Sequence, residues 1–344
     1  MPKFQNIIAL GIFYRIIIFF LIIAFPFEHY IFGSISPISF QEFADLKFYL
    51  RFGEKDFQLS NFLSNYHSLI TFNISNIDNR FPGPLFPIIL FITQYSENFT
   101  YFMTIVIFIC EITAYVIWSL KKFKDNNLFT LIFFSLMPIP LYFGYIHSTD
   151  TIMYLLFTFL YFEIINKPNK NITFLLFFLI LCCRPNSVII FISCMFYFLL
   201  IKKNKYFFIL SFLFFLLSMF YYGPYFIYEM SVLKNFDVDL TSYGVLEILF
   251  LLINYIKKII FLLGFVPTDS GSIFFYTLRC LCGVVFFIGM INLYNKKNIK
   301  IDKLFVSFFV FLTASVFFPA YRYILPITPI LIYCFCEFIF KKGK

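Results

Sequence analysis

The chain alternates between long apolar runs and short polar segments. The apolar runs are continuous, as in Phe207 to Tyr222, and show no strand-like alternation of apolar and polar residues. Runs of about 17–25 apolar residues are long enough to cross the hydrocarbon core of a bilayer as α-helices. The pattern therefore predicts an all-α, polytopic transmembrane helical bundle with about ten crossings. The predicted crossings are residues 7–25, 101–120, 128–145, 151–165, 172–183, 188–201, 206–222, 274–294, 304–318 and 323–340.

Two further apolar segments, residues 84–95 and 246–265, do not fit this series. The first is short and opens with "PGPLFP"; the second carries Lys257 and Lys258 at its centre, where a charge is costly at mid-bilayer. We expect both to lie in, or dip into, the outer interface as amphipathic or re-entrant helices. The alternative is that both are ordinary crossings.

Basic segments between the runs set the orientation, because cytoplasmic loops carry an excess of Lys and Arg. With these segments in the cytoplasm, the long loop at residues 28–82 is extracytoplasmic. The other predicted outer segments are "YIHSTD" (145–150), "RPNS" (184–187), the loop at 223–243, "VPTDSGS" (266–272) and "PAYRY" (319–323). The net charge of +9 is explained by these clusters, so we expect no nucleic-acid partner. The basic segments are "KKFKDNN", "NKPNKN", "KKNK", "NKKNIKIDK" and "KKGK".

Composition agrees with a membrane protein. Hydrophobic residues make up 61% of the chain and charged residues 13%, against about 25% charged in a soluble domain. The eight cysteines lie in apolar segments without metal-ligand spacing to histidine, so we interpret them as small buried hydrophobic residues and predict no metal site. Residues 1–344 are predicted to form a single integral membrane domain.

Two arginines interrupt apolar sequence on the outer side. Arg184 follows a short apolar run, so we expect it to lie below the outer surface, with Pro185 ending the helix behind it. Arg322 lies between two apolar runs with Tyr321 and Tyr323 beside it. A guanidinium suits phosphate, because it stays charged and presents a planar fork to two oxygens. The alternatives are snorkelling toward lipid headgroups and a structural ion pair with Asp150.

One carboxylate in the outer loop at residues 28–82 is a candidate catalytic group. Asp45 is surrounded by apolar and aromatic residues, so its segment is predicted to be a helix lying on the membrane. A partly desolvated carboxylate in such a place is suited to act as a general base. His147 and Asp150, at the start of a later crossing, are expected to assist or orient.

Taken in order, the motifs resemble the GT-C superfamily of polyprenyl-phosphate-dependent glycosyltransferases. The loop carboxylate is followed by "FPGPLFPIILFI", "MPIPLYFGYIHSTDTIMYLLFTFLYF", "CCRPNSVIIF" and "YRYILPITPILI". The nearest likeness is to protein-mannosyltransferase-like enzymes and to the GPI mannosyltransferase that adds the second mannose. The resemblance implies a catalytic carboxylate, matched by Asp45, a second acidic residue, matched by Asp150, and a phosphate-binding arginine, matched by Arg322. Many relatives have adjacent acidic residues, whereas Leu46 follows Asp45, so a divalent metal stays an open question.

The activity implied by this resemblance is an inverting hexosyl transfer on the extracytoplasmic side. A polyprenyl-phosphate-linked sugar is the donor, and a lipid, glycan or protein is the acceptor. Asp45 takes the proton of the acceptor hydroxyl, and a cation stabilises the phosphate that leaves. The candidates for that cation are Arg322, Arg184 and Lys47, and the candidates for holding the sugar are Tyr49, His67, Tyr321 and Tyr323.

The main alternative is a transporter or flippase of a lipid-linked sugar or anion. Such a protein is expected to place polar groups near mid-bilayer on broken helices. Here the charges gather at one face, so the sequence favours the transferase. We expect a multi-pass protein, surrounded by membrane lipids, in a bacterial inner membrane with a periplasmic site. The endoplasmic reticulum membrane is the alternative.

Overall fold

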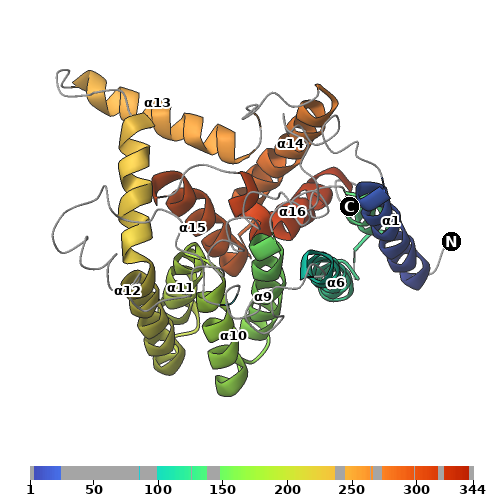
Figure 1. The fold of residues 1–344 in the computed structure, drawn as a ribbon, viewed down its shortest axis with the longest axis horizontal. Coiled ribbons are helices and arrows are strands. Elements are labelled where there is room, and N and C mark those ends of the chain that lie inside the picture. Colours follow the sequence, from blue (N-terminus) through green and yellow to red (C-terminus); the bar gives the residue numbers. More distant parts are fainter. Residues whose placement is uncertain are drawn as a thin grey trace.

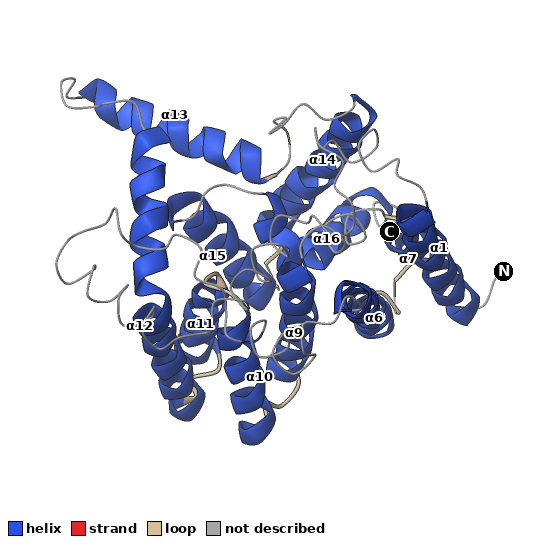
Figure 2. Ribbon diagram, viewed as in Figure 1, coloured by secondary structure: helices blue, strands red, loops and turns tan. Residues whose placement is uncertain are grey.

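The computed structural model describes ten stretches of helix and adjoining turn, and every regular element in them is helical (Figure 2). These stretches are residues 4–24, 85, 99–124, 126–137, 148–236, 245–263, 265, 273–297, 299–316 and 321–340. The all-α fold class is therefore confirmed for the part of the chain that the structure describes.

The helices pack into a bundle, with α13 lying across one end of it at a steep angle to α12 (Figure 1). Their order along the chain is α1 (Phe4–Ala24), α6 (Phe99–Lys121), α7 (Leu128–Leu136), α9 (Ser148–Ile165), α10 (Lys170–Cys183), α11 (Ser187–Phe196), η3 (Tyr197–Ile201), α12 (Lys205–Phe236), α13 (Val245–Leu262), α14 (Ile273–Asn295), α15 (Lys300–Val316), η4 (Tyr321–Ile327) and α16 (Thr328–Phe340).

Local sequence explains where several helices begin and end. At the start of α10 the side chain of Asn169 accepts hydrogen bonds from the backbone N–H groups of Asn171 and Ile172, at 2.9 and 3.4 Å. The same helix ends where Arg184 adopts an extended backbone, with φ −158° and ψ 158°. A residue before proline avoids the helical region, so Pro185 stops the helix at this position, as the sequence predicts.

Helices α6 and α9 lie side by side and run in the same direction. Trp118 Nε1 of α6 donates to Thr158 Oγ1 of α9 at 2.8 Å, and one turn later Lys122 Nζ donates to Tyr161 Oη at 2.5 Å. These two contacts pair residues that are 40 and 39 positions apart in the sequence. A residue of α9 therefore lies at the same height along the bundle as the α6 residue 39 or 40 positions before it. The same relation gives the relative heights of polar residues on the two helices.

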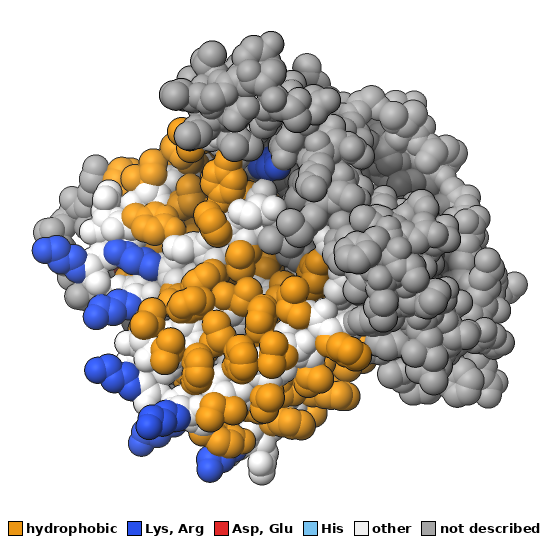
Figure 3. All heavy atoms as spheres, turned by 90° about the vertical axis from the view of Figure 1, so that its left-hand side faces the viewer, with side chains coloured by type: hydrophobic (Ala, Val, Ile, Leu, Met, Phe, Trp, Pro, Cys, Tyr) orange, Lys and Arg blue, Asp and Glu red, His pale blue; other side chains and the backbone are white. Residues whose placement is uncertain are grey.

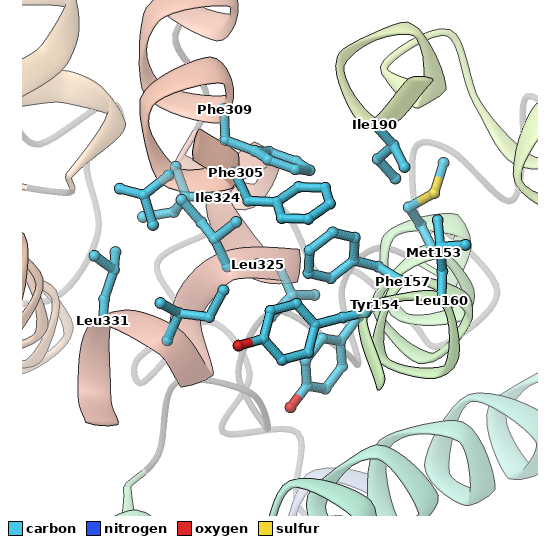
Figure 4. Close-up of a cluster of buried hydrophobic side chains, with 14 of the residues drawn as sticks. Met153, Tyr154, Phe157, Leu160, Ile190, Phe305, Phe309, Ile324, Leu325 and Leu331 are labelled. Atoms are coloured by element: carbon cyan, nitrogen blue, oxygen red, sulfur yellow. The ribbon is translucent and has the colours of Figure 1, made fainter. Parts of the chain in front are cut away.

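A buried apolar cluster is drawn mainly from α9, α15 and η4, with Ile190 of α11 and Leu331 of α16 beside them (Figure 4). The ring of Phe157 packs edge to face against Phe305 and Phe309, with centroids 5.2 and 5.6 Å apart. Ile324 and Leu325 are fully buried in the same cluster. Edge-to-face pairs contribute about 0.5–1.5 kcal/mol beyond the burial of the rings, so this cluster fixes the three elements against each other.

Helices α14 and α16 approach each other closely at Gly289. A methyl group added there would lie 2.2 Å from the carbonyl oxygen of Leu331. We expect Gly289→Ala to push the helices apart and to lower the free energy of unfolding by about 1–3 kcal/mol. Thermal unfolding in detergent measures the loss. Val284→Ala, at a position of α14 that is 44% exposed, is the control. A Gly289→Ala protein as stable as the parent would contradict this packing.

Two of the predicted segments differ from the observed ones. Helix α7 ends at Leu136, and Met137 is extended because Pro138 follows it, so the predicted run at 128–145 is not helical at Met137. Helix α12 continues to Phe236 through residues predicted to be an outer loop (223–243). No run of strong helix breakers follows Pro224, and a single Gly-Pro pair did not end the helix.

Two helical segments in the described residues are long and apolar enough to cross a membrane: Lys205–Gly223 and Tyr323–Phe340. Shorter apolar helical segments accompany them: Phe4–Phe20, Lys170–Cys183, Ser187–Ile201 and Cys280–Asn295. These two segments fit a membrane protein by length and composition, and the number of about ten crossings stays a prediction. The segment at 246–265 forms α13, whose position in the interface also stays a prediction, and residues 84–95, apart from Leu85, lie outside the described part.

Candidate functional site

Three residues that the sequence placed separately on the outer side meet in one cluster. Asp150 lies in the first turn of α9, Arg184 caps the end of α10, and Tyr323 lies in η4. Arg184 Nη1 forms an ion pair with Asp150 Oδ1, and Arg184 Cζ lies 5.8 Å from the centre of the Tyr323 ring. The side chains of Arg184 and Asp150 are 10% and 2% exposed. The ion pair with Asp150 that was named as an alternative is thus present for Arg184.

This cluster lies below the end of the bundle. The register between α6 and α9 places Asp150 level with Cys110 and Glu111, close to the midpoint of α6. Helix α6 continues for more than ten residues beyond that level, and at a rise of 1.5 Å per residue this is about 16 Å of helix. The Arg184–Asp150 pair is therefore recessed along α6, and its depth below an outer membrane surface stays a prediction.

A second buried ion pair lies at the same level. Arg15 Nε of α1 donates to Glu111 Oε1 of α6 at 2.8 Å, and the two side chains are 0% and 1% exposed. Arg15 Nη1 also donates to the carbonyl oxygens of Gly11 and Ser135, at 3.2 and 2.7 Å. The guanidinium carbon lies 3.8 Å from the centre of the Tyr115 ring. Carbonyl oxygens, a carboxylate and an aromatic face thus compensate this buried cation.

The sequence analysis missed this pair, although a signal was present. Arg15 stands alone near the middle of the predicted crossing at 7–25, and Glu111 stands alone near the middle of the one at 101–120. A charge within a crossing is expensive and by default marks a functional or structural site, with its partner on another helix. Two lone charges of opposite sign at similar depth are a reason to predict a pair.

Tyr154 lies between the levels of Asp150 and the end of α9, next to the Arg15–Glu111 pair. It lies one turn after Asp150 on α9, is fully buried and interacts electrostatically with both Glu111 and Arg15. We call Arg15, Glu111, Asp150, Tyr154 and Arg184 the buried polar layer. Within the described residues, four of its atoms have no hydrogen-bond partner: Arg15 Nη2, Glu111 Oε2, Asp150 Oδ2 and Tyr154 Oη. Buried polar atoms are nearly always hydrogen-bonded, so this layer has the capacity to bind further polar groups.

The opposite end of the bundle carries a different cluster. Lys122 Nζ donates to Asp302 Oδ2 at 2.7 Å, and Tyr161 Oη donates to Asp302 Oδ1. The ammonium nitrogen lies 5.0 Å from the ring centres of both Tyr161 and Tyr333. This cluster is well paired, and it ties α6, α9 and α15 together. We therefore assign it to structure, and it too was missed by the sequence analysis.

Several candidate residues lie outside the described part of the chain. They are Asp45, Lys47, Tyr49, His67 and His147. The backbones of Tyr321 and Arg322 lie in η4, directly before Tyr323, and their side chains are outside the description. Among the described residues no three His, Cys, Asp or Glu side chains lie close enough to hold a metal ion, so the question of a divalent metal stays open.

Comparison with known proteins does not assign a function. No protein-family model, no curated protein and no solved structure matches the chain. The function is therefore argued below from the residues themselves.

Proposed function

We propose that the chain is an integral membrane glycosyltransferase of the GT-C type, which moves a sugar from a polyprenyl-phosphate donor to an acceptor on the extracytoplasmic side. Membrane placement is supported by the apolar surface: large hydrophobic side chains cover one face of the bundle, and basic side chains gather along its edge (Figure 3). Soluble proteins rarely expose apolar patches of more than a few hundred Å². The membrane that we propose is the bacterial inner membrane, with the endoplasmic reticulum membrane as the alternative.

One observation carries the transfer proposal: Arg184, Asp150 and Tyr323 meet in one buried cluster. They come from the motifs "CCRPNS", "YIHSTD" and "YRYILP", whose order suggested the GT-C resemblance. The backbone of Arg322 is adjacent to Tyr323, whose ring lies 5.8 Å from Arg184 Cζ, and this supports a role for Arg322 at the same site. A guanidinium has five N–H donors in a planar fork, which suits it to a carboxylate and to a phosphate.

The proposed roles follow from this arrangement. Asp45 is the general base that removes the proton of the acceptor hydroxyl as its oxygen attacks the anomeric carbon. Because this attack comes from the face opposite the phosphate, the configuration at the anomeric carbon inverts. Arg322, with Arg184 and Lys47, stabilises the phosphate that leaves. Asp150 orients Arg184. The remaining candidates, which would orient or hold the sugar, are His147, Tyr49, His67, Tyr321 and Tyr323.

The test is transfer from a panel of radiolabelled polyprenyl-phosphate sugars in membranes that contain the protein. We expect product from the parent with at least one donor, and about 10²–10³-fold less from Arg322→Ala, because a charge-stabilising donor is lost. Lys124→Ala, an exposed change at the opposite end of the bundle, is the control and should leave the rate unchanged. If Arg322→Ala matched the parent, Arg322 would not bind the phosphate.

A transporter or flippase is the second candidate, and one specific observation favours it. The Arg15–Glu111 pair lies near the midpoints of α1 and α6, where the sequence analysis expected a transporter to place polar groups. Movement of a labelled lipid-linked sugar across proteoliposomes, without transfer to any acceptor, would support this candidate over the transferase.

A further inference from the structure

Two neighbouring loops carry a group of lysines at the end of the bundle opposite the recessed site. The loop between α9 and α10, with the first residue of α10, supplies Lys167 and Lys170. The connection between η3 and α12, with the first residue of α12, supplies Lys202, Lys203 and Lys205. All five side chains are exposed, and we call them the basic patch.

The two loops lie beside each other because α10 packs against α12. Lys170 Nζ lies 4.8 Å from the centre of the Tyr206 ring, and Phe174 packs edge to face on Phe214 at 5.5 Å. Glu163 is the acidic side chain described beside the patch, and its Oε1 accepts a hydrogen bond from the backbone N–H of Asn169 at 2.6 Å. The patch therefore keeps a clear excess of positive charge.

The backbone at Lys203 is unusual. With a φ of 50°, it is the residue other than glycine that adopts a positive φ within the described chain. It ends η3, where the N–H of Asn204 donates to the carbonyl oxygen of Phe198 at 2.9 Å. Glycine normally takes such a helix-ending position, because a β-carbon is strained there. At this position Lys203 adds its charge to those of Lys202 and Lys205 beside it.

Two helices also begin at this patch: α10 at Lys170 and α12 at Lys205. The amino-terminal end of a helix carries a partial positive charge. Asn169 and Asn204 already accept hydrogen bonds from N–H groups at these two ends, so the partial charge of the helices is what adds to the attraction that the lysines exert on an anion.

The apolar face beside the patch is exposed along both helices (Figure 3). Its large side chains are each about 40–60% exposed, and contact of so much apolar surface with water is unfavourable. They are Ile172, Phe174, Leu175 and Phe178 on α10, and Tyr206, Ile209, Leu213, Leu216 and Phe220 on α12.

We propose that the basic patch binds the headgroup phosphate of an anionic phospholipid, whose acyl chains lie along the exposed face of α10 and α12. Lysines at the edge of an apolar face complement such a lipid in both charge and polarity, and each is attracted to an anionic leaflet. The proposal rests on the proposed membrane placement and not on the sugar-transfer chemistry. A protein that binds no anionic lipid could therefore still transfer sugar, and the two proposals can fail separately.

Native mass spectrometry of the purified protein tests this, with phosphatidylglycerol and phosphatidylcholine titrated separately. We expect phosphatidylglycerol to bind more tightly, and the triple variant K170Q/K202Q/K205Q to weaken that binding by about tenfold or more. The control triple K124Q/K297Q/K300Q removes three exposed lysines outside the patch and should leave the tightest site within twofold of the parent. Equal weakening by both triples, or equal binding of the two lipids, would overturn the proposal.

Lys203→Gly separates the charge from the fold. Glycine relieves the strained φ, so we expect the melting temperature to rise, while phosphatidylglycerol binding weakens about fivefold because one charge is lost. Unchanged lipid binding in this more stable variant would show that the lysine is not needed for the lipid. Glycerophosphoglycerol, the headgroup without acyl chains, should not bind at the same concentration. Equally tight binding of this compound would indicate a soluble-anion site and contradict the lipid assignment.

Discussion

Arg15→Ala is expected to lower the free energy of unfolding by about 3–5 kcal/mol, because it leaves the Glu111 carboxylate buried without its cation. Glu111 is 1% exposed, and the ion pair at 2.8 Å is the cationic contact described for it. The change also removes the hydrogen bonds of Arg15 to the carbonyl oxygens of Gly11 and Ser135. We expect the variant to unfold at a clearly lower temperature, or to accumulate poorly in membranes.

Thermal unfolding with a thiol-reactive fluorescent dye suits this measurement. The chain has eight free cysteines, of which seven are buried and Cys280 is half-buried, so dye labelling reports unfolding. The matched control is the double variant Arg15→Met with Glu111→Leu, which replaces the pair by apolar side chains of similar size. Removing both partners is often neutral, so the double variant should recover most of the stability. If the double variant were as unstable as Arg15→Ala, the loss would come from packing and not from an unpaired charge.

Asp45→Asn is expected to reduce sugar transfer by about 10²–10⁴-fold, because an amide cannot take the proton of the acceptor hydroxyl. The substitution keeps the size of the side chain. We therefore expect a fall in kcat with little change in the KM for the donor, which separates loss of the base from loss of donor binding. The measurement is the initial rate of transfer in membranes with equal amounts of protein, at several donor concentrations.

Glu42→Gln is the matched control, since Glu42 is an acidic residue three positions earlier in the same outer loop. It should transfer sugar at nearly the parent rate. Transfer by Asp45→Asn at the parent rate would remove the assignment of the general base. Loss of activity in Glu42→Gln alone would move that assignment to Glu42.

The sequence predicted the helices well where apolar runs are bounded by polar residues. The run at 274–294 became α14 (Ile273–Asn295), and the run at 101–120 became α6 (Phe99–Lys121). It also predicted that Pro185 ends a helix. The end of α12 was not predictable in this way, because a single Gly-Pro pair bends or ends a helix depending on what the following residues contact.

The candidate site was predictable only in part. Charges near the ends of apolar runs pointed to Asp150 and Arg184, and the structure brings these two together. The Arg15–Glu111 and Lys122–Asp302 pairs were missed, because each joins helices far apart in the sequence and depends on which helix faces pack. Periodicity gives the face of a helix that is buried but not its neighbour.

The length of α10 has a consequence for the surrounding lipid. Its 14 residues span about 21 Å, whereas the hydrocarbon core of a typical bilayer is about 30 Å thick. Its amino terminus carries Lys170 and its carboxyl end is followed by Arg184, so neither end extends the apolar length. Taken alone, α10 would leave about 9 Å of such a core uncovered, and neighbouring helices such as α6, which continues beyond the level of Arg184, or local thinning of the bilayer would have to make up the difference. The segment beside α10 is therefore where we expect the bilayer to be most sensitive to changes in lipid chain length.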